Sequence, residues 1–298
     1  MGRLLAILIP CALIAQSVPA NYDTAYNLAL AYLEKGATES SRKIIEALLQ
    51  RQDKAELHNL LGDVEEREGH VQQSAEQYEI AARMDPSEEN LFDLGNELLL
   101  HRGFQPALKV LDYATQKYPQ SARLRVGLGV AHYSLGQYDQ ALDALCRAVD
   151  LDPKDTRALD FLGRMYDVAP AKASEVTSRL ARFAREYPNN AAANYYYALS
   201  LRRRTTQSHS ADADQEAGKL LRQATRLRPD WADAHYQLGL LYEDELQPVN
   251  AIREYQTAVR LQPKFAKAHY RLARLYEKNG QRQLAQSEFQ AFEALNAK

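Results

Sequence analysis

Two histidines at matching places in the sequence are the first residues that could do chemistry. His235 and His269 are 34 residues apart, and each stands in the same tripeptide, Ala-His-Tyr. Imidazole is a common metal ligand and a common general base near neutral pH. Their recurrence at one helical position favours packing against neighbouring helices instead. We therefore expect no metal at either histidine.

Two other groups of charged side chains could bind ions. Asp212 and Asp214 could hold a cation, but they lie in a polar stretch without apolar periodicity, which favours solvation. The run 202–204 consists of three arginines that follow an expected helix. Arginines are favourable at a helix C-terminus, and they could also form a patch that binds anions. Both interpretations of the arginine run stay open.

The sequence motifs of common enzymes are absent. H-E-x-x-H, G-x-S-x-G, the P-loop and C-x-x-C do not occur, and the glycines of 127–129 lie inside an expected helix. Cys146 is the single cysteine after Cys11, and on a helix it is expected to be a small packed residue. We predict a protein that is not an enzyme and that uses no metal and no cofactor.

The composition is that of a folded protein without a strong overall charge. Of the 298 residues, 46% are hydrophobic and 26% are charged, which supplies enough apolar surface for a core. The net charge of −2 creates no positive field that would attract nucleic acid. We therefore expect protein or peptide partners and no nucleic acid.

Residues 1–20 have the layout of a secretory signal peptide. Arg3 precedes an apolar run, 4–15, and small residues lead up to Ala20. The run is shorter than the roughly 20 residues that span a bilayer. We expect cleavage near Ala20 and an exported protein of the periplasm or another extracytoplasmic compartment. A membrane anchor or a lipid at Cys11 is the alternative.

A period of about 34 residues organises the rest of the chain. A small residue returns at intervals of 33 to 41 residues, at Ala29, Gly62, Gly95, Gly129, Gly163, Ala198, Gly239 and Ala273. Prolines follow the same interval, at Pro86, Pro119, Pro153, Pro188, Pro229 and Pro263. Helical amphipathicity repeats every 3.6 residues and does not produce such an interval. Because glycine is unfavourable inside a helix, its return implies that another helix passes close by.

The unit 232–265 shows the pattern most clearly. Its two helical runs carry Leu238, Gly239 and Tyr242, then Ala251, Tyr255 and Ala258, and it closes with Pro263. These positions resemble the L-G-x-x-Y, A-x-x-x-F and P positions of the tetratricopeptide repeat (TPR) family. The resemblance implies an all-α fold, a right-handed α-solenoid of about eight stacked helix-turn-helix units.

Eight units account for residues 21–298. They are expected at about 22–54, 55–87, 88–121, 122–155, 156–190, 191–231, 232–265 and 266–298. The sixth unit contains extra polar residues, 205–214, which we expect to form an inserted surface loop. The last unit has no further helix to cover it. We expect four apolar residues to cap this end or to form a homodimer: Leu284, Phe289, Phe292 and Leu295.

The resemblance also implies a concave groove, lined by the first helix of each unit, that receives a peptide. The family's groove positions correspond here to Tyr26, Asn59, Phe92, Asn96, Asp160, Arg164, Tyr195, Tyr236, Tyr270 and Arg274. Aromatic and arginine side chains often anchor interfaces, although tyrosine is also common at this place in the repeat. The family's clamp for the C-terminal carboxylate of chaperones is absent, because Val126 and Val130 stand where it needs basic residues.

The sequence therefore predicts a non-enzymatic scaffold or adaptor that binds a protein or peptide in its groove. Two alternatives remain open. One is a non-catalytic subunit that contacts an envelope polysaccharide or a secretion or pilus machine. The other is a cytosolic or membrane-anchored TPR adaptor.

Overall fold

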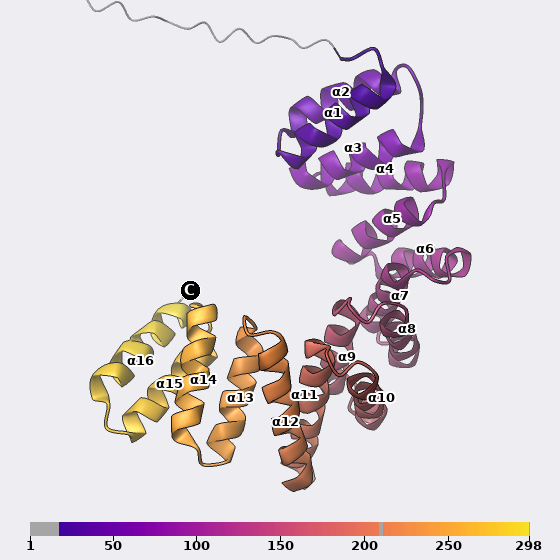
Figure 1. Ribbon diagram of the computed structural model, residues 1–298. Helices are drawn as coiled ribbons and strands as arrows, with labels where there is room; N and C mark the ends of the chain where they lie inside the picture. The colour runs from indigo at the N-terminus through magenta and orange to yellow at the C-terminus, as the bar shows by residue number, and fades with distance from the viewer. Residues whose placement is uncertain (1–17, 209–210, 298) are drawn as a thin grey trace, which may run out of the picture. The chain divides into compact units, whose positions relative to one another are not determined.

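The computed structural model describes residues 18–208 and 211–297, and their regular structure is entirely helical (Figure 1). The helices are α1 (Tyr22–Glu34), α2 (Thr38–Leu49), α3 (Ala55–Glu68), α4 (Val71–Met84), α5 (Glu88–Leu100), α6 (Phe104–Lys117), α7 (Ala122–Ser134), α8 (Tyr138–Leu151), α9 (Arg157–Val168), the 3-10 turn η1 (Pro170–Lys172), α10 (Ala173–Glu186), α11 (Ala191–Ser208), α12 (Ala211–Leu227), α13 (Ala232–Asp244), α14 (Pro248–Leu261), α15 (Ala266–Lys278) and α16 (Arg282–Asn296). The predicted all-α fold is confirmed.

The chain forms two compact units, Met1–Gly103 and Phe104–Lys298, called unit 1 and unit 2 below. In unit 1, each of the helices α1 to α5 packs against the next one along the chain. In unit 2, α6 to α16 also pack in chain order, and α11 touches α9 as well. Each unit is therefore a stack of helices in chain order, and the division at Gly103 separates α5 from α6, the two helices of the predicted repeat 88–121. The predicted signal peptide lies outside the described residues except for 18–20.

At Gly62 and Gly239, the recurring small residue lies against a side chain of the second helix of its pair. A Cβ atom added to Gly239 would lie 2.5 Å from the ring of Tyr255, and one added to Gly62 would lie 2.7 Å from the ring of Tyr78. Both tyrosines are buried on the second helix of the pair. The expectation that a neighbouring helix excludes a Cβ at these positions is confirmed.

The turn after the first helix requires a left-handed backbone. Four repeats place glycine there with φ between 72° and 78°: Gly36, Gly69, Gly136 and Gly280. Arg102 and Leu246 occupy the same place in two other repeats, with φ of 60° and 56°. Because left-handed backbone is unfavourable for residues with a Cβ, these two turns carry local strain.

The predicted loop at 205–214 is wrong for the residues that the structure describes. Residues 205–208 belong to α11 and residues 211–214 to α12, which have 18 and 17 residues, whereas α13 and α15 have 13. The remaining two, 209–210, lie outside the described residues. Longer helices satisfy the backbone N–H and C=O groups that a loop would leave to water. Asp212 and Asp214 lie in the first turn of α12, where acidic side chains are favourable.

The described residues 18–208 and 211–297 contain no helix that combines the length and the apolar composition needed to cross a bilayer.

Candidate interaction surface

The predicted groove residues of unit 1 lie on its first helices. Tyr26 on α1, Asn59 on α3 and Phe92 on α5 are partly buried, and Asn96 on α5 is exposed. The ring of Tyr26 stacks on that of Tyr22, with centroids 6.1 Å apart. The Asn59 amide donates to an Asp93 carboxylate oxygen at 2.8 Å and so joins α3 to α5. These side chains are held by neighbours within unit 1.

Acidic side chains follow one face of α3. Glu56 and Glu66 are exposed and Asp63 is partly buried between them. The Tyr78 hydroxyl donates to Asp63 at 2.7 Å and to Glu66 at 3.1 Å. Burial, and then the nearby carboxylates of Asp93 and Glu66, raise the pKa of Asp63 to about 6. Burial is the larger cause of this shift, and Arg67 opposes it.

Three predicted groove residues in the middle of the chain contact other side chains of unit 2. Tyr195 is 6% exposed, and its ring lies 4.3 Å from that of Trp231. Asp160 accepts a hydrogen bond from Tyr196 at 2.6 Å and forms an ion pair with Arg164 at 2.9 Å. Tyr195 is therefore a core residue, whereas Arg164 stays exposed.

A small pocket opens near the end of unit 2. It has a volume of about 290 Å³ and is lined by Tyr236, Lys267, Tyr270, Arg271 and Phe292. The Tyr270 ring lies 5.2 Å from that of Phe292, and Tyr270 is 39% exposed. Aromatic rings thus form the walls, and two cationic side chains accompany them. Such a pocket suits an apolar or aromatic group that lies beside a negative charge.

Basic side chains continue from this pocket along α15. Lys267, Arg271, Arg274 and Lys278 are all exposed, and their spacing of four, three and four residues places them on one face of the helix. Arg271 lies 3.6 Å from Glu243 on α13. Among the described residues, the other three have no acidic partner within ion-pair distance. We call these four residues the basic stripe, and we call Glu56, Asp63 and Glu66 the acidic stripe.

The two units differ strongly in charge. Unit 1 has nine basic and 17 acidic side chains, a net charge of −8, and unit 2 has 28 basic and 22 acidic ones, a net charge of +6. Histidines are counted as neutral. The total of −2 therefore conceals a separation of charge along the chain.

The predicted apolar end of the chain is mostly covered by its own residues. Phe289 packs against the core of unit 2, and Phe292 packs against Tyr270. Leu295 is partly buried, and Leu284 is 48% exposed. This packing corresponds to self-capping, one of the two outcomes expected for these residues.

The two histidines, His235 and His269, each join the two helices of a pair. In each, Nδ1 faces a carboxylate of the second helix, Glu254 at 2.7 Å from His235 and Glu288 at 2.5 Å from His269. Each Nε2 faces a proline carbonyl at 3.1 Å in the preceding turn. Both histidines therefore have the packing role that their recurrence predicts.

Cys146 and two arginines of the run 202–204 also serve the fold. Cys146 is 3% exposed, and burial raises the pKa of its thiol to about 12, so it is the packed residue predicted. Arg202 forms an ion pair with Asp244 at 2.5 Å, and Arg203 donates to the Gly163 carbonyl oxygen at 3.1 Å. These contacts favour a structural role for both arginines over an anion-binding patch.

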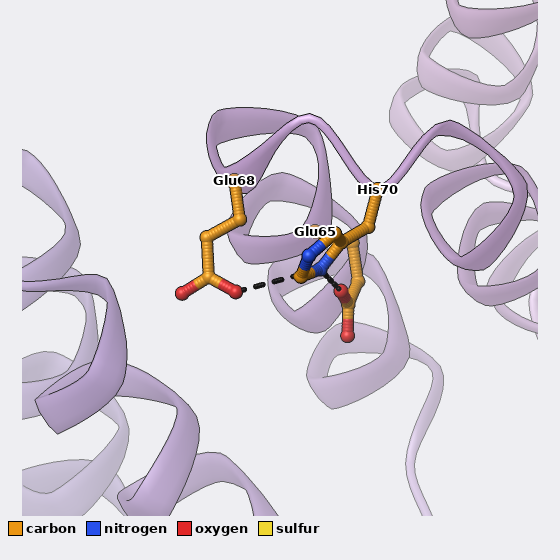
Figure 2. A group of neighbouring side chains, drawn as sticks. All are labelled: Glu65, Glu68 and His70. Atoms are coloured by element: carbon orange, nitrogen blue, oxygen red, sulfur yellow. Dashed lines mark hydrogen bonds and ion pairs between the residues drawn. The ribbon is translucent and has the colours of Figure 1, made fainter.

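One group of side chains in unit 1 has the composition of a metal site. Ligand atoms of Glu65, Glu68 and His70 lie within 4.8 Å of one another (Figure 2). Arg42 on α2 forms ion pairs with both glutamates, with Glu68 at 2.6 Å. It neutralises the charge that would attract a cation, and its hydrogen bond, ahead of that of His70, lowers the pKa of Glu65. These ion pairs therefore hold α2 against α3.

Sequence reasoning missed most of the C-terminal pocket. It placed Tyr236 and Tyr270 in the groove but not Arg271, which belongs to a different helical row, and it assigned Phe292 of α16 to the apolar end of the chain. The available signal was the four-three-four spacing of basic residues from Lys267, visible in the sequence of α15. It also missed the acidic stripe, although Asp63 follows Asn59 by four residues on the same helical face.

Comparison with known sequences identifies repeats at both ends of the chain. Models described as tetratricopeptide or TPR repeats match residues 26–89 and 92–156, residues 250–280, and residues 266–298. The Arabidopsis thaliana Peroxisome biogenesis protein 5 is 28% identical over 163 residues, 55% of this chain and 21% of that protein. The Protein CTR9 homolog of the same plant is 40% identical over 63 residues, 21% of this chain and 6% of that protein. The chain thus matches about a fifth or less of the length of these relatives.

Solved structures share the fold at low sequence identity. Yeast Tom70 has a TM-score of 0.58 and 16% identity, covering 93% of this chain and 57% of its own. The Pseudomonas aeruginosa protein pilF has a TM-score of 0.54 and 19% identity, covering 71% of this chain and 92% of its own. The helical solenoid predicted from the sequence is confirmed.

Proposed function

Because the chain belongs to the tetratricopeptide repeat family, we propose that it is a non-enzymatic adaptor that holds a protein segment against the first helices of its repeats. The observation that carries this proposal is the pocket of Tyr236, Lys267, Tyr270, Arg271 and Phe292. Stable interfaces rely on a few aromatic and arginine anchors in small pockets. At about 290 Å³, this pocket has room for one side chain of a partner rather than for a whole cofactor.

The chemistry of the pocket specifies the kind of segment. Tyr270 and Phe292 offer apolar ring surface, and Lys267 and Arg271 offer positive charge at the same place. An apolar side chain next to Asp or Glu would satisfy both features. A neutral sugar would use the rings and leave the two cations without a partner, so a peptide is favoured over a neutral polysaccharide.

A peptide library displayed on phage tests this proposal directly. Selection on the purified protein is expected to enrich segments that combine an apolar with an acidic residue. The affinity of a selected peptide should fall about tenfold or more in Tyr270→Ala, because the variant removes a pocket wall. Tyr113→Ala is the matched control, since Tyr113 on α6 is 50% exposed and does not line the pocket.

Two outcomes would contradict the proposal. One is the enrichment of no peptide, and the other is an equal loss of affinity in both tyrosine variants. Binding of envelope oligosaccharides with no selected peptide would favour the polysaccharide alternative.

We also propose that the protein is exported, on the basis of the signal-peptide layout of residues 1–20. N-terminal sequencing of the protein from its native host, after cell fractionation, is the test. A chain that begins at Asn21 in an extracytoplasmic fraction would support export. An intact Met1 in the cytosol would favour a cytosolic adaptor, and an intact Met1 in the membrane fraction would favour an anchored one.

A homodimer through the apolar C-terminal end has less support than the adaptor function. Of its four expected contact residues, Phe289 and Phe292 pack within the same chain and Leu295 is partly buried. Exposed Leu284 alone offers little apolar area for a stable dimer.

A further inference from the structure

The acidic stripe on α3 is a negatively charged helix face, on which Glu56 lies 3.5 Å from Lys54 and accepts a hydrogen bond from the Tyr22 hydroxyl at 2.5 Å. Glu56, Asp63 and Glu66 lie seven and then three residues apart, which places them on one side of α3 over about 15 Å. Glu66 has no basic partner within ion-pair distance among the described residues, and the polar contact shown for its carboxylate is the Tyr78 hydroxyl. Exposed Glu89 on α5 adds to the field, since it helps to raise the pKa of Tyr26 after burial and Glu56.

The basic stripe on α15 has the opposite charge and nearly the same length. Lys267 and Lys278 are 11 residues apart, so the four cations extend over about 16 Å. All four side chains are exposed, and exposed Tyr270 lies among them. The basic stripe therefore presents positive charge and one aromatic ring on α15, the first helix of the repeat 266–298.

The complementarity extends beyond the two stripes. Unit 1 carries a net charge of −8 and unit 2 a net charge of +6, so long-range attraction favours an encounter between unlike units. Unit 2 begins with α6, and α15 is the ninth α-helix after it in chain order. A second copy of the chain can present its acidic stripe to α15.

We propose that the acidic stripe of one copy binds the basic stripe of a second copy, so that the protein self-associates head to tail. Such a contact joins two different surfaces, and each copy keeps one free stripe of either sign. Assembly can therefore continue beyond a dimer. The inference rests on the proposed function in one respect, since an acidic side chain of the second copy takes the place of the partner's acidic residue at the C-terminal pocket.

Charge exchange between two variants tests this pairing. The first variant is Glu56→Lys with Glu66→Lys, which changes the net charge of the α3 stripe from −3 to +1, and the second is Lys267→Glu with Arg274→Glu and Lys278→Glu, which changes that of the α15 stripe from +4 to −2. In each variant alone, the two stripes have net charges of the same sign, so each is expected to sediment as a monomer. An equimolar mixture is expected to re-associate, because each reversed stripe then meets its complement on the other variant. Sedimentation velocity up to about 100 µM, at about 0.05 M and about 0.5 M salt, measures the association, which should weaken about tenfold or more at high salt.

Matched variants control for net charge and for folding. Glu76→Lys with Glu79→Lys makes the same charge change as the first variant on the exposed face of α4, and Lys219→Glu with Arg226→Glu and Arg260→Glu makes that of the second variant on α12 and α14. Both controls should self-associate as the parent does. The circular dichroism of all four variants should match that of the parent, which shows that the substitutions leave the helices folded.

Three results would overturn the inference. They are a parent protein that stays monomeric at low salt, reversed variants that associate as the parent does, and a mixture that fails to re-associate. The proposed function has a separate test, because it is contradicted if Tyr270→Ala binds the selected peptide no more weakly than Tyr113→Ala does. If peptide binding depends on Tyr270 while the parent stays monomeric, the adaptor function stands and only the pairing of copies is wrong.

Discussion

The ring of Tyr255 on α14 lies directly against Gly239 on α13, so close that a Cβ on the glycine would approach the ring to 2.5 Å. The Tyr255 hydroxyl continues past the glycine and donates to Glu243 at 2.5 Å. Tyr78 repeats the arrangement over Gly62, where its hydroxyl reaches Asp63 and Glu66. A small residue on the first helix thus lets a tyrosine of the second helix reach a carboxylate on the first.

Gly239→Ala is expected to destabilise unit 2. Overpacking costs about 1–3 kcal/mol, and alanine recovers about 1 kcal/mol through its helix propensity. The net change in the free energy of unfolding should be a loss of up to about 2 kcal/mol, measured by urea denaturation. Adding Tyr255→Leu should cost less in the alanine background than in the parent. Equal costs in the two backgrounds would show that the ring does not impose the glycine.

Asp63→Asn is expected to stabilise unit 1 at neutral pH. The pKa of Asp63 is raised from 3.8 to about 6, so its ionised form is less favourable in the folded protein than in the unfolded chain. This penalty is absent below pH 3.8, grows as the pH rises toward 6 and is constant above that. Asparagine keeps an acceptor for Tyr78 and removes the penalty, so stability should rise by about 1–2 kcal/mol at pH 8 and hardly change at pH 4.

Asp155→Asn provides the opposite case for the same measurement. The hydrogen bond from Arg157 lowers the pKa of Asp155, so its ionised form stabilises the fold above the ordinary pKa and loses this effect on acidification. This variant should lower the stability of unit 2 at pH 8. Equal responses of the two asparagine variants to pH would contradict both assignments.

Leu246→Gly is expected to raise stability. Leu246 has φ of 56° and is 87% exposed, so its side chain contributes strain and little packing. Left-handed backbone costs about 1–2 kcal/mol for a residue with a Cβ, and glycine adds up to about 1 kcal/mol of unfolded-state entropy. The expected gain of about 0.5–1 kcal/mol should appear in a thermal melt. Leu246→Ala keeps the strain and should give no gain.

Arg42→Met is expected to weaken the contact between α2 and α3. The side chain of Glu65 is 9% exposed, and removal of its guanidinium partner leaves a carboxylate that is poorly solvated. We expect a loss of about 1–3 kcal/mol at pH 7. The loss should shrink on acidification, because burial without Arg42 favours the protonated form of Glu65 in the variant. A loss that does not depend on pH would indicate packing by Arg42 rather than charge.

The sequence predicted the fold through residues whose identity the packing dictates. Gly239 and Tyr255 show this, because a tyrosine of the second helix fits only where the first helix has a small residue. The same logic failed at 205–214, since a polar segment without apolar periodicity is equally compatible with a loop and with the ends of longer helices. Periodicity identifies a helix only where apolar residues recur along the sequence.

The candidate surface was predictable only in part. Tyr270 and Arg274 belong to two adjoining helical rows that the family pattern marks, whereas Phe292 reaches the pocket from the following helix. Tyr195 belongs to the same row as Tyr270, and it is buried against the ring of Trp231, which lies in the turn between α12 and α13. The charge contrast was missed because the regular repeat gives no sign that the chain divides at Gly103.

Cys146 has a consequence for how the protein can be studied. Its thiol is buried among Val149, Leu142 and other residues of one core cluster in unit 2, where a reagent in water does not reach it. In a chain that begins at Asn21 it is the only thiol. The rate of labelling by a thiol reagent would then report how often the core around α8 opens, without any substitution. A ligand that steadies this part of the stack would slow the labelling, so the protein contains its own probe of local unfolding.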